Sequence, residues 1–274
     1  MIKLYRYFPL GYLDATKNNE QFSYVIEMLR NGTFLFQNPM NFNDPFDCKP
    51  KFKMNLENPE EYELLCNQMR KENPYCGYAG AVSILDKLKL DPKKTDKLIE
   101  MLENGFNENM KKSGIMCFSG KLKEILLWSH YSNGHKGYCI EFDYGEIKKY
   151  LDSNEIGALE PVVYSNDYPA RTYASVDPLE NIKSIIFTKS KKWAYEKEYR
   201  LLIPNMDNNP TLPLTCIKSI YFGVKISDAD YSKMMDLIDN VKTSINLFKM
   251  HLAKDKYNIY PVRINNEVKN TVIG

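Results

Sequence analysis

Apolar and polar positions alternate in two different rhythms along this chain, and together they predict both strands and helices. Short apolar runs rich in aromatic and β-branched residues, bounded by Pro, Gly or polar clusters, are typical of strands. Such runs lie at Leu4–Phe8, Thr33–Phe36, Ile115–Ser119, Tyr138–Asp143, Pro161–Tyr164, Tyr199–Ile203, Ile217–Phe222 and Asn258–Ile264. The last run is predicted to be an edge strand, because Pro261 cannot donate a ladder hydrogen bond.

Apolar residues at helical spacing predict helices between these strands. The first predicted helix, Gln21–Asn31, carries Phe22, Val25 and Leu29 on one face and ends before Gly32, a natural C-terminal stop. Further helices are predicted at Glu124–Tyr131, Pro178–Lys189 and Asp228–Val241.

The segment from about residue 55 to 112 differs from its flanks, because charged helical patterns replace the strand signal. These patterns cover Pro59–Lys71 and Thr95–Lys111, with small residues around Gly77–Ala81 between them. We therefore expect one α+β domain over residues 1–274, with a central mixed or antiparallel sheet flanked by helices. A helical insertion at about 55–112 and a C-terminal helix and edge strand at about 228–264 complete the predicted architecture.

Composition and charge indicate a globular protein of the cytoplasm. Hydrophobic residues make up 43% and charged residues 26% of the 274 positions. A net charge of +2 gives no strong electrostatic case for nucleic acid or for a membrane surface. No apolar stretch reaches the length of a membrane span, and the N-terminus lacks a secretory segment. The six cysteines form no CxxC and no zinc-site spacing, so we expect reduced thiols and no metal.

The stretch KWAYEKEYRLL, residues 192–202, places two carboxylates and a guanidinium in a largely apolar segment. Read as a strand, it points Glu196, Glu198 and Arg200 to one face; read as a helix, it makes an i,i+4 surface pair of Glu196 and Arg200. The apolar continuation favours the strand. The carboxylates then either form salt bridges with Arg200, Lys189 or Lys191, or they orient a hydroxyl or stabilise a developing cation. Both interpretations stay open.

Residues 117–143 combine a strand, an aromatic helix, a Gly-containing turn and a second strand. They are interpreted either as a β-α-β unit with an aromatic core helix and a Gly-rich turn, or as a pocket wall with exposed polar groups. His130 and His135 are five apart and do not share a helix face, so a metal site there is disfavoured.

The stretch NPMNFNDPFDC, residues 38–48, is dense in Asn, Asp and Pro and predicts an ordered loop, because Asn and Asp side chains bond the nearby backbone. Asp44 and Asp47 either cap turns around Pro45 or have a binding role, and Asn43 is a further cleft candidate.

The order of these motifs resembles one bacterial family. LYRYF, NGTFLF, NPMNFNDPFDC, CFS…LLWSHYSNGHKGYCIEFD, PVVYS and KSKKWAYEKEYRLL follow one another over roughly residues 3 to 203, as in the family designated domain of unknown function twenty-nine seventy-one. That name carries no activity. More distantly, the chain is similar to ADP-ribosyltransferases, in which an early strand bears His or Arg, a central strand bears Ser, Thr or Tyr, and a late strand bears a catalytic Glu.

This second resemblance implies an ADP-ribosyltransferase-like fold and an enzyme that consumes NAD, as a transferase or glycohydrolase acting as a toxin or phage-defence effector. Glu198 would hold the ribose hydroxyl and stabilise an oxocarbenium-like centre, and Glu196 would contact an acceptor that stays unidentified. The residues expected to contact NAD, the only nucleotide implied, are Arg6, Ser119, Trp128 and Tyr131. Further cleft candidates are Asn43, Asp44, His130, His135, Lys189 and Arg200. The alternative is a non-catalytic ligand- or protein-binding module, whose recognition surface is the loop 38–48 and the helix 125–131.

Overall fold

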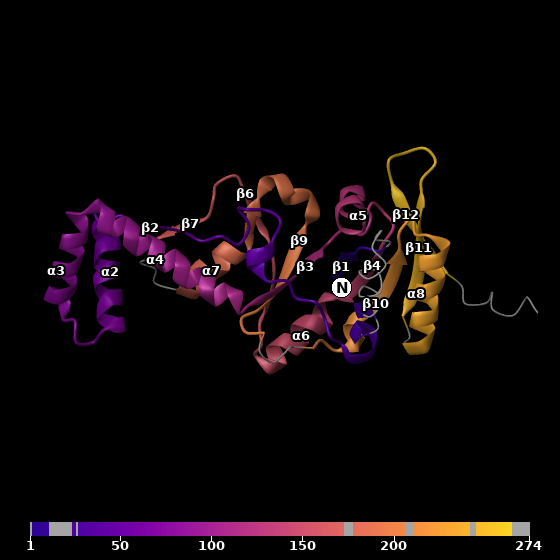
Figure 1. The fold of residues 1–274 in the computed structure, drawn as a ribbon, viewed down its shortest axis with the longest axis horizontal. Coiled ribbons are helices and arrows are strands. Elements are labelled where there is room, and N and C mark those ends of the chain that lie inside the picture. Colours follow the sequence, from indigo (N-terminus) through magenta and orange to yellow (C-terminus); the bar gives the residue numbers. More distant parts are fainter. Residues whose placement is uncertain are drawn as a thin grey trace, which may run out of the picture. The chain divides into compact units, whose positions relative to one another are not determined.

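The computed structural model describes residues 2–10, 24–25, 27–172, 178–206, 211–241 and 245–264. Contacts between residues divide the chain into two compact units, each made of separate segments of the sequence (Figure 1). The sheet unit consists of Met1–Phe36, Ile115–Pro161 and Ala194–Gly274, and the helical unit consists of Gln37–Gly114 and Val162–Trp193. That residues 1–274 form one domain stays a prediction.

In the described part of the chain, the sheet unit is built on an eight-stranded sheet in the order β12-β11-β10-β4-β1-β3-β9-β5. The strands are β1 (Lys3–Phe8), β3 (Gly114–Ser119), β4 (Tyr138–Asp143), β5 (Ala158–Pro161), β9 (Glu198–Ile203), β10 (Ile217–Phe222), β11 (Asn246–Leu252) and β12 (Ile259–Arg263). Antiparallel pairing joins β1 to β3 and β4, β4 to β10, β5 to β9 and β11 to β12, whereas β10 and β11 run parallel. The helices of this unit are α5 (Ile125–Tyr131), α6 (Tyr144–Asn154) and α8 (Asp228–Val241), with further helical residues at 24–25 and 27–31.

The two faces of the sheet bury different side chains. One face carries the larger core, in which Leu4 and Phe142 pack with apolar residues of α6 and α8. The opposite face carries Tyr5 and Cys139, which pack with Trp128 of α5. Because neighbours along a strand point to opposite faces, this division fixes the direction in which each candidate side chain points.

The helical unit contains three successive helices (Figure 1), and the first two of them share a small core. These are α2 (Pro59–Glu72), α3 (Tyr78–Lys89) and α4 (Pro92–Lys111), and α7 (Pro178–Ile186) follows later in the chain. Asn58 caps α2 by accepting from the N–H groups of Glu60 and Glu61, while Pro59 occupies the first turn, where its missing N–H costs nothing. Leu65 of α2 and Leu85 of α3 are buried in the shared core.

The rest of the helical unit is short strands and turns. The parallel pairs are β2 (Lys51–Lys53) with β7 (Ala170–Thr172), and β6 (Val163–Ser165) with β8 (Thr188–Ser190). Three 3-10 helices are described: η1 (Pro39–Asn41) in the helical unit, η2 (Lys191–Glu196) across the boundary of the two units in sequence, and η3 (Leu214–Cys216) in the sheet unit.

None of the described helices is long and apolar enough to cross a membrane.

The α+β class, the mostly antiparallel sheet, the insertion of helices and the edge position of β12 are confirmed. The predicted strand Thr33–Phe36 is wrong. Only Thr33 forms a bridge, to Thr211, and Leu35 bonds to side chains instead: its N–H donates to the Tyr24 hydroxyl and its carbonyl accepts from Arg6. Side chains therefore satisfy the backbone that a neighbouring strand would otherwise have paired.

Several boundaries also differ from the sequence predictions. The predicted strand Pro161–Tyr164 covers the end of β5 and the start of β6, and the helix predicted to reach Lys189 ends at Ile186 because β8 follows. The small-residue stretch around Gly77–Ala81 opens α3, a helix the sequence did not predict, because burial of Ala81 and Leu85 outweighs the weak propensity of its glycines. Residues 21–23 of the first predicted helix lie outside the described residues.

Candidate functional site

The predicted strand through KWAYEKEYRLL is interrupted at Lys197. This residue has a φ of 46°, in the left-handed region, between the 3-10 turn η2 and the start of β9. The end of β3 holds the kink, because the Ser119 hydroxyl donates to the Glu196 carbonyl and the Gly120 N–H donates to the Lys197 carbonyl. A left-handed residue breaks the alternation of a strand, so the prediction that Glu196 and Glu198 share one strand face is wrong.

Glu198 and Arg200 do share a strand face, and they form a buried ion pair. The Arg200 Nε lies 2.7 Å from Oε1 of Glu198, and the Arg200 Nη2 lies 3.4 Å from Oε2 of Glu198. Arg200 is completely buried and Glu198 nearly so. Burial, followed by the neighbouring charge of Glu198, raises the pKa of the Cys117 thiol well above its usual value. The thiol therefore stays protonated at neutral pH, which argues against a nucleophilic role.

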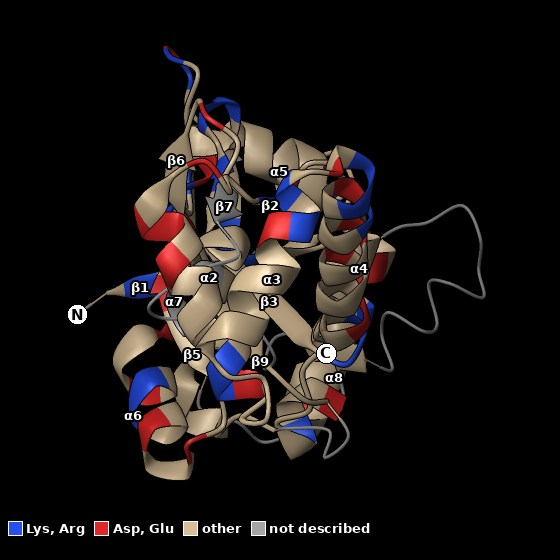
Figure 2. Cartoon of the chain, turned by 90° about the vertical axis from the view of Figure 1, so that its left-hand side faces the viewer, with Lys and Arg blue, Asp and Glu red and all other residues tan. Residues whose placement is uncertain are grey.

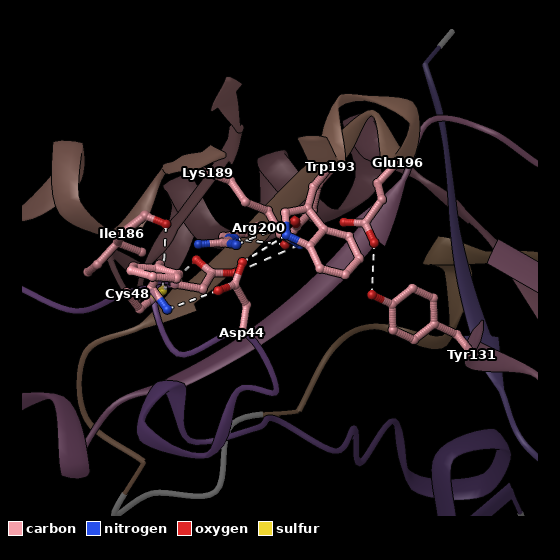
Figure 3. Close-up of polar contacts among 11 residues, drawn as sticks. Asp44, Cys48, Tyr131, Ile186, Lys189, Trp193, Glu196 and Arg200 are labelled. Carbon is pink, nitrogen blue, oxygen red and sulfur yellow. Dashed lines mark hydrogen bonds and ion pairs between the residues drawn. The ribbon is translucent and has the colours of Figure 1, made fainter. Parts of the chain in front are cut away.

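Glu196 is also buried, and Tyr131 of α5 reaches its carboxylate. The Tyr131 hydroxyl donates to Oε1 of Glu196 over 2.8 Å (Figure 3). Ser119, whose hydroxyl bonds the Glu196 carbonyl, is buried as well. The structure thus brings Ser119, Tyr131 and Glu196 together at the junction of β3, α5 and η2, with Cys117 of the same strand facing Glu198.

Arg6 does not join this group. Tyr5 pairs with Ser119 across β1 and β3, so these two side chains point to one face and Arg6 points to the other. There the guanidinium lies 5.4 Å from the centre of the Phe8 ring and donates to the Leu35 carbonyl over 2.8 Å. The three positions that the distant resemblance singled out therefore lie on two faces of the sheet.

The aromatic and histidine candidates around α5 differ in their burial and contacts. Trp128 is completely buried, its indole N–H donates to the Leu122 carbonyl, and its ring meets Tyr7 edge-on, so it is a core residue without a free face for a ligand. His130 is exposed. His135 is half-buried with a φ of 69°, and burial lowers its pKa. Among the residues that the model describes, no group of His, Cys, Asp and Glu is placed to hold a metal ion.

In the helical unit, the loop 38–48 is ordered, as the sequence predicted, and it buries two aspartates. Asp44 accepts from the Phe46 N–H through one oxygen and from the Trp193 indole N–H, over 2.8 Å, through the other (Figure 3). Asp47 faces Lys189, whose Nζ lies 3.8 Å from its Oδ2. The cation–π contact of Lys189 with Trp193, at 5.0 Å from the ring centre, completes a charged cluster. Asn43, by contrast, is exposed.

A pocket of about 260 Å³ opens beside this cluster. Its lining residues are Asp44, Phe46, Asp47, Ser165, Asn166, Asp167, Tyr168, Pro169, Thr188, Lys189 and Ser190. Asp44 and Lys189 were cleft candidates from the sequence, and Asp47 was weighed with Asp44 as a turn cap or a binding residue. Trp193 was missed, and nothing in the sequence marked it.

A further buried carboxylate escaped the sequence reasoning. Glu141 of β4 lies 2.9 Å from the Lys3 ammonium and accepts from the Tyr221 hydroxyl. Burial and the charge of Glu141 raise the pKa of Tyr5 to about 12. These contacts satisfy Glu141 on the same face of the sheet as Tyr5.

The sheet unit and the pocket thus define an α+β protein with buried carboxylates in both units. The family model described as "Protein of unknown function (DUF2971)" matches residues 127–201, about a quarter of the chain. The chain is similar to that family over the segment from α5 to β9. No curated protein sequence and no solved structure matches the chain, so the comparisons offer no support for the ADP-ribosyltransferase resemblance.

Proposed function

We propose that this protein binds a small polar molecule in the pocket of the helical unit. One observation carries the proposal: the pocket gathers two buried carboxylates and a nearly buried ammonium around a cavity of about 260 Å³. Buried charges are costly and are usually retained where they are paired or where they serve a site.

The lining gives the pocket a rigid polar wall and an aromatic side. Asp44 is fixed by Phe46 and Trp193, so its orientation does not depend on a ligand. Asp47 and Lys189, an ion pair with 3.8 Å between Nζ and Oδ2, place an acceptor and a donor side by side in the lining. Tyr168 meets the exposed Phe46 ring edge-on and supplies an apolar surface.

The charge of the lining and the volume of the pocket limit the class of ligand that can bind. Asp44, Asp47 and Asp167 outnumber Lys189, so the lining is net negative and repels anions such as nucleotide phosphates. The volume lies below the roughly 300–1,000 Å³ that drug-sized ligands occupy. A neutral polyhydroxyl compound or a small organic cation fits both conditions.

Titration calorimetry with ribose, adenosine, choline and ADP tests the proposal. We expect heat from a neutral or cationic member of this panel and none from ADP. Asp47→Asn and Lys189→Met should each weaken that binding at least tenfold, whereas Asp96→Asn, at an exposed position of α4, should not change it. Binding of ADP alone, or equal affinity in all three variants, contradicts the proposal.

The second candidate is the NAD-consuming activity, favoured by the grouping of Ser119, Tyr131 and Glu196 at one junction. In this reading Glu196, rather than the ion-paired Glu198, supplies the negative charge that an oxocarbenium-like centre needs. Nicotinamide release from NAD by purified protein, with and without cell lysate, tests it. Activity that Glu196→Gln removes, in a protein of unchanged melting temperature, supports the enzyme; absence of nicotinamide under both conditions removes it.

A further inference from the structure

The strands β11 and β12 extend beyond the other strands of the sheet as a two-stranded ribbon (Figure 1). The strand β10 pairs with β11 over residues 246–249, whereas β12 pairs with β11 over residues 248–252. Among the described strands, residues 250–252 and 259–261 therefore pair with each other alone. We call residues 249–263 the ribbon.

Positive charge is concentrated on the ribbon. Its cations are Lys249, Lys254, Lys256 and Arg263, and its one carboxylate is Asp255. The ribbon thus has a net charge of +3, whereas the whole chain has a net charge of +2, so the rest of the chain is slightly negative. Figure 2 shows a contrast in α4, where blue and red residues occur together. The small net charge of the protein therefore conceals a basic projection.

The ribbon also exposes apolar and aromatic side chains beside these cations. Tyr257 is fully exposed and Leu252 is 64% exposed, and both lie outside the two cores of the sheet unit. Cations and tyrosine hydroxyls contact the phosphates of nucleic acids, and apolar side chains contact the methyl groups of thymine. The side chains of the ribbon therefore match the chemistry of a nucleic acid.

We propose that the ribbon binds double-stranded DNA by placing the loop 253–258 in the major groove. That groove is about 12 Å wide and 8.5 Å deep and admits a two-stranded ribbon. The three residues of each strand beyond β10 span about 10 Å, so the loop reaches the floor of the groove. The two strands lie about 4.8 Å apart, which leaves space on both sides for the lysine side chains to reach the phosphates.

The backbone of the loop is held in place, so Lys254 and Lys256 are presented at a fixed position. The Ala253 N–H donates to the Asn258 carbonyl over 2.9 Å, and the Asn258 N–H donates to the Lys256 carbonyl over 2.8 Å. A loop that is ordered before binding loses less conformational entropy when the duplex immobilises it.

A duplex fits the ribbon better than a single strand. Proteins that bind single strands stack successive bases on exposed ring faces. In the ribbon, all of which the structure describes, the Tyr260 ring stacks on His251 with 5.9 Å between their centres. Tyr257 alone then offers an open ring, too few for a run of stacked bases. The major groove of an RNA duplex is too narrow for side chains to read, which favours DNA.

Fluorescence anisotropy of a labelled duplex of about 20 base pairs, two helical turns, titrated with the full chain, tests the proposal. At physiological salt we expect a dissociation constant on the order of 10⁻⁶–10⁻⁴ M. With four phosphate contacts, the affinity should fall about a hundredfold between about 50 and 200 mM KCl. Absence of binding at the lower salt concentration, or binding that salt does not weaken, overturns the proposal.

Two double variants separate the ribbon from the net charge of the chain. Lys254→Ala with Lys256→Ala should weaken binding about tenfold or more, and the slope of log affinity against log salt should become shallower by about two. Lys93→Ala with Lys97→Ala removes the same charge from exposed positions of α4 and should change neither quantity. Equal effects of the two double variants overturn the proposal. Equal melting temperatures confirm that both variants are folded.

The same titration with other polyanions tests the choice of partner. A single strand of the same sequence and vesicles of phosphatidylglycerol should each bind more weakly than the duplex. Tighter binding of either one shows that the ribbon does not read a DNA groove, and overturns the proposal.

Discussion

Arg200 and Glu198 form an ion pair, Nε to Oε1 at 2.7 Å, between two almost completely buried side chains of one strand. Both charges have left water, so each depends on the other for compensation. Breaking the pair should therefore destabilise the sheet unit.

Arg200→Met should therefore lower the free energy of unfolding by about 3–5 kcal/mol, because it leaves the Glu198 carboxylate buried without its cation. Urea denaturation measures the loss. The double variant Glu198→Leu with Arg200→Met removes both charges and should recover most of it. A single variant that costs less than about 1 kcal/mol would mean that solvent reaches the pair.

Tyr131→Phe should cost about 1 kcal/mol, because it removes the hydroxyl that donates to the Glu196 carboxylate; the half-exposure of Tyr131 reduces the value expected for a fully buried bond. Tyr257→Phe is the matched control, since that ring is fully exposed. Equal unfolding midpoints for the two variants would show that the Tyr131 bond contributes nothing to stability.

Asp143→Ala should destabilise the protein by about 1 kcal/mol through the loss of a helix cap. The Asp143 side chain accepts from the N–H groups of Gly145, over 2.9 Å, and Glu146 at the start of α6. Asp143→Asn keeps an accepting oxygen and should recover part of the loss. Thermal unfolding of both variants measures the difference, and equal losses would argue that the nearby Lys218 ammonium, not the cap, is what Asp143 provides.

Stability should fall as pH rises above about 9. Burial raises the pKa of the thiols of Cys117 and Cys139 well above 9.0, and that of Cys216 to about 12. In the unfolded chain these thiols ionise near their ordinary value, so the folded state retains protons that the unfolded state loses. The stabilisation is complete below about pH 9 and declines up to the folded pKa. Urea midpoints at pH 7.5 and 10 measure the decline, which should be smaller in Cys117→Ala; an unchanged midpoint contradicts it.

Much of the sheet was predictable because its strands are apolar runs with clear ends, and β4 and β10 match their predicted bounds residue for residue. The helix α6 was missed although Asp143 and Glu146 form a capping pattern at its start. The strand β11 was missed because nothing in its local pattern reveals that it pairs in parallel with β10.

The candidate site was less predictable, because contacts between residues that are distant in sequence determine its geometry. Period-two alternation pointed Glu196 and Glu198 to one face, but the left-handed conformation of Lys197 depends on contacts with β3 that are distant in sequence. The bond between Trp193 and Asp44 joins residues 149 positions apart, and only the folded chain brings them together. Composition correctly marked the loop 38–48 as a turn-forming segment, since Asn38 and Asp44 each accept from the backbone N–H two residues further on.

The central place of β1 has a consequence for synthesis of the chain. This strand precedes its partners β3 and β4 by more than a hundred residues, and β9 to β12 come later still. During synthesis, the apolar side chains of β1 have no partner strand while the helical insertion is being made. Closing so long a loop carries an entropic cost before any pairing repays it, so folding should be slow compared with helical proteins of equal size. A nascent chain of this kind exposes β1 until β3 and β4 have been made.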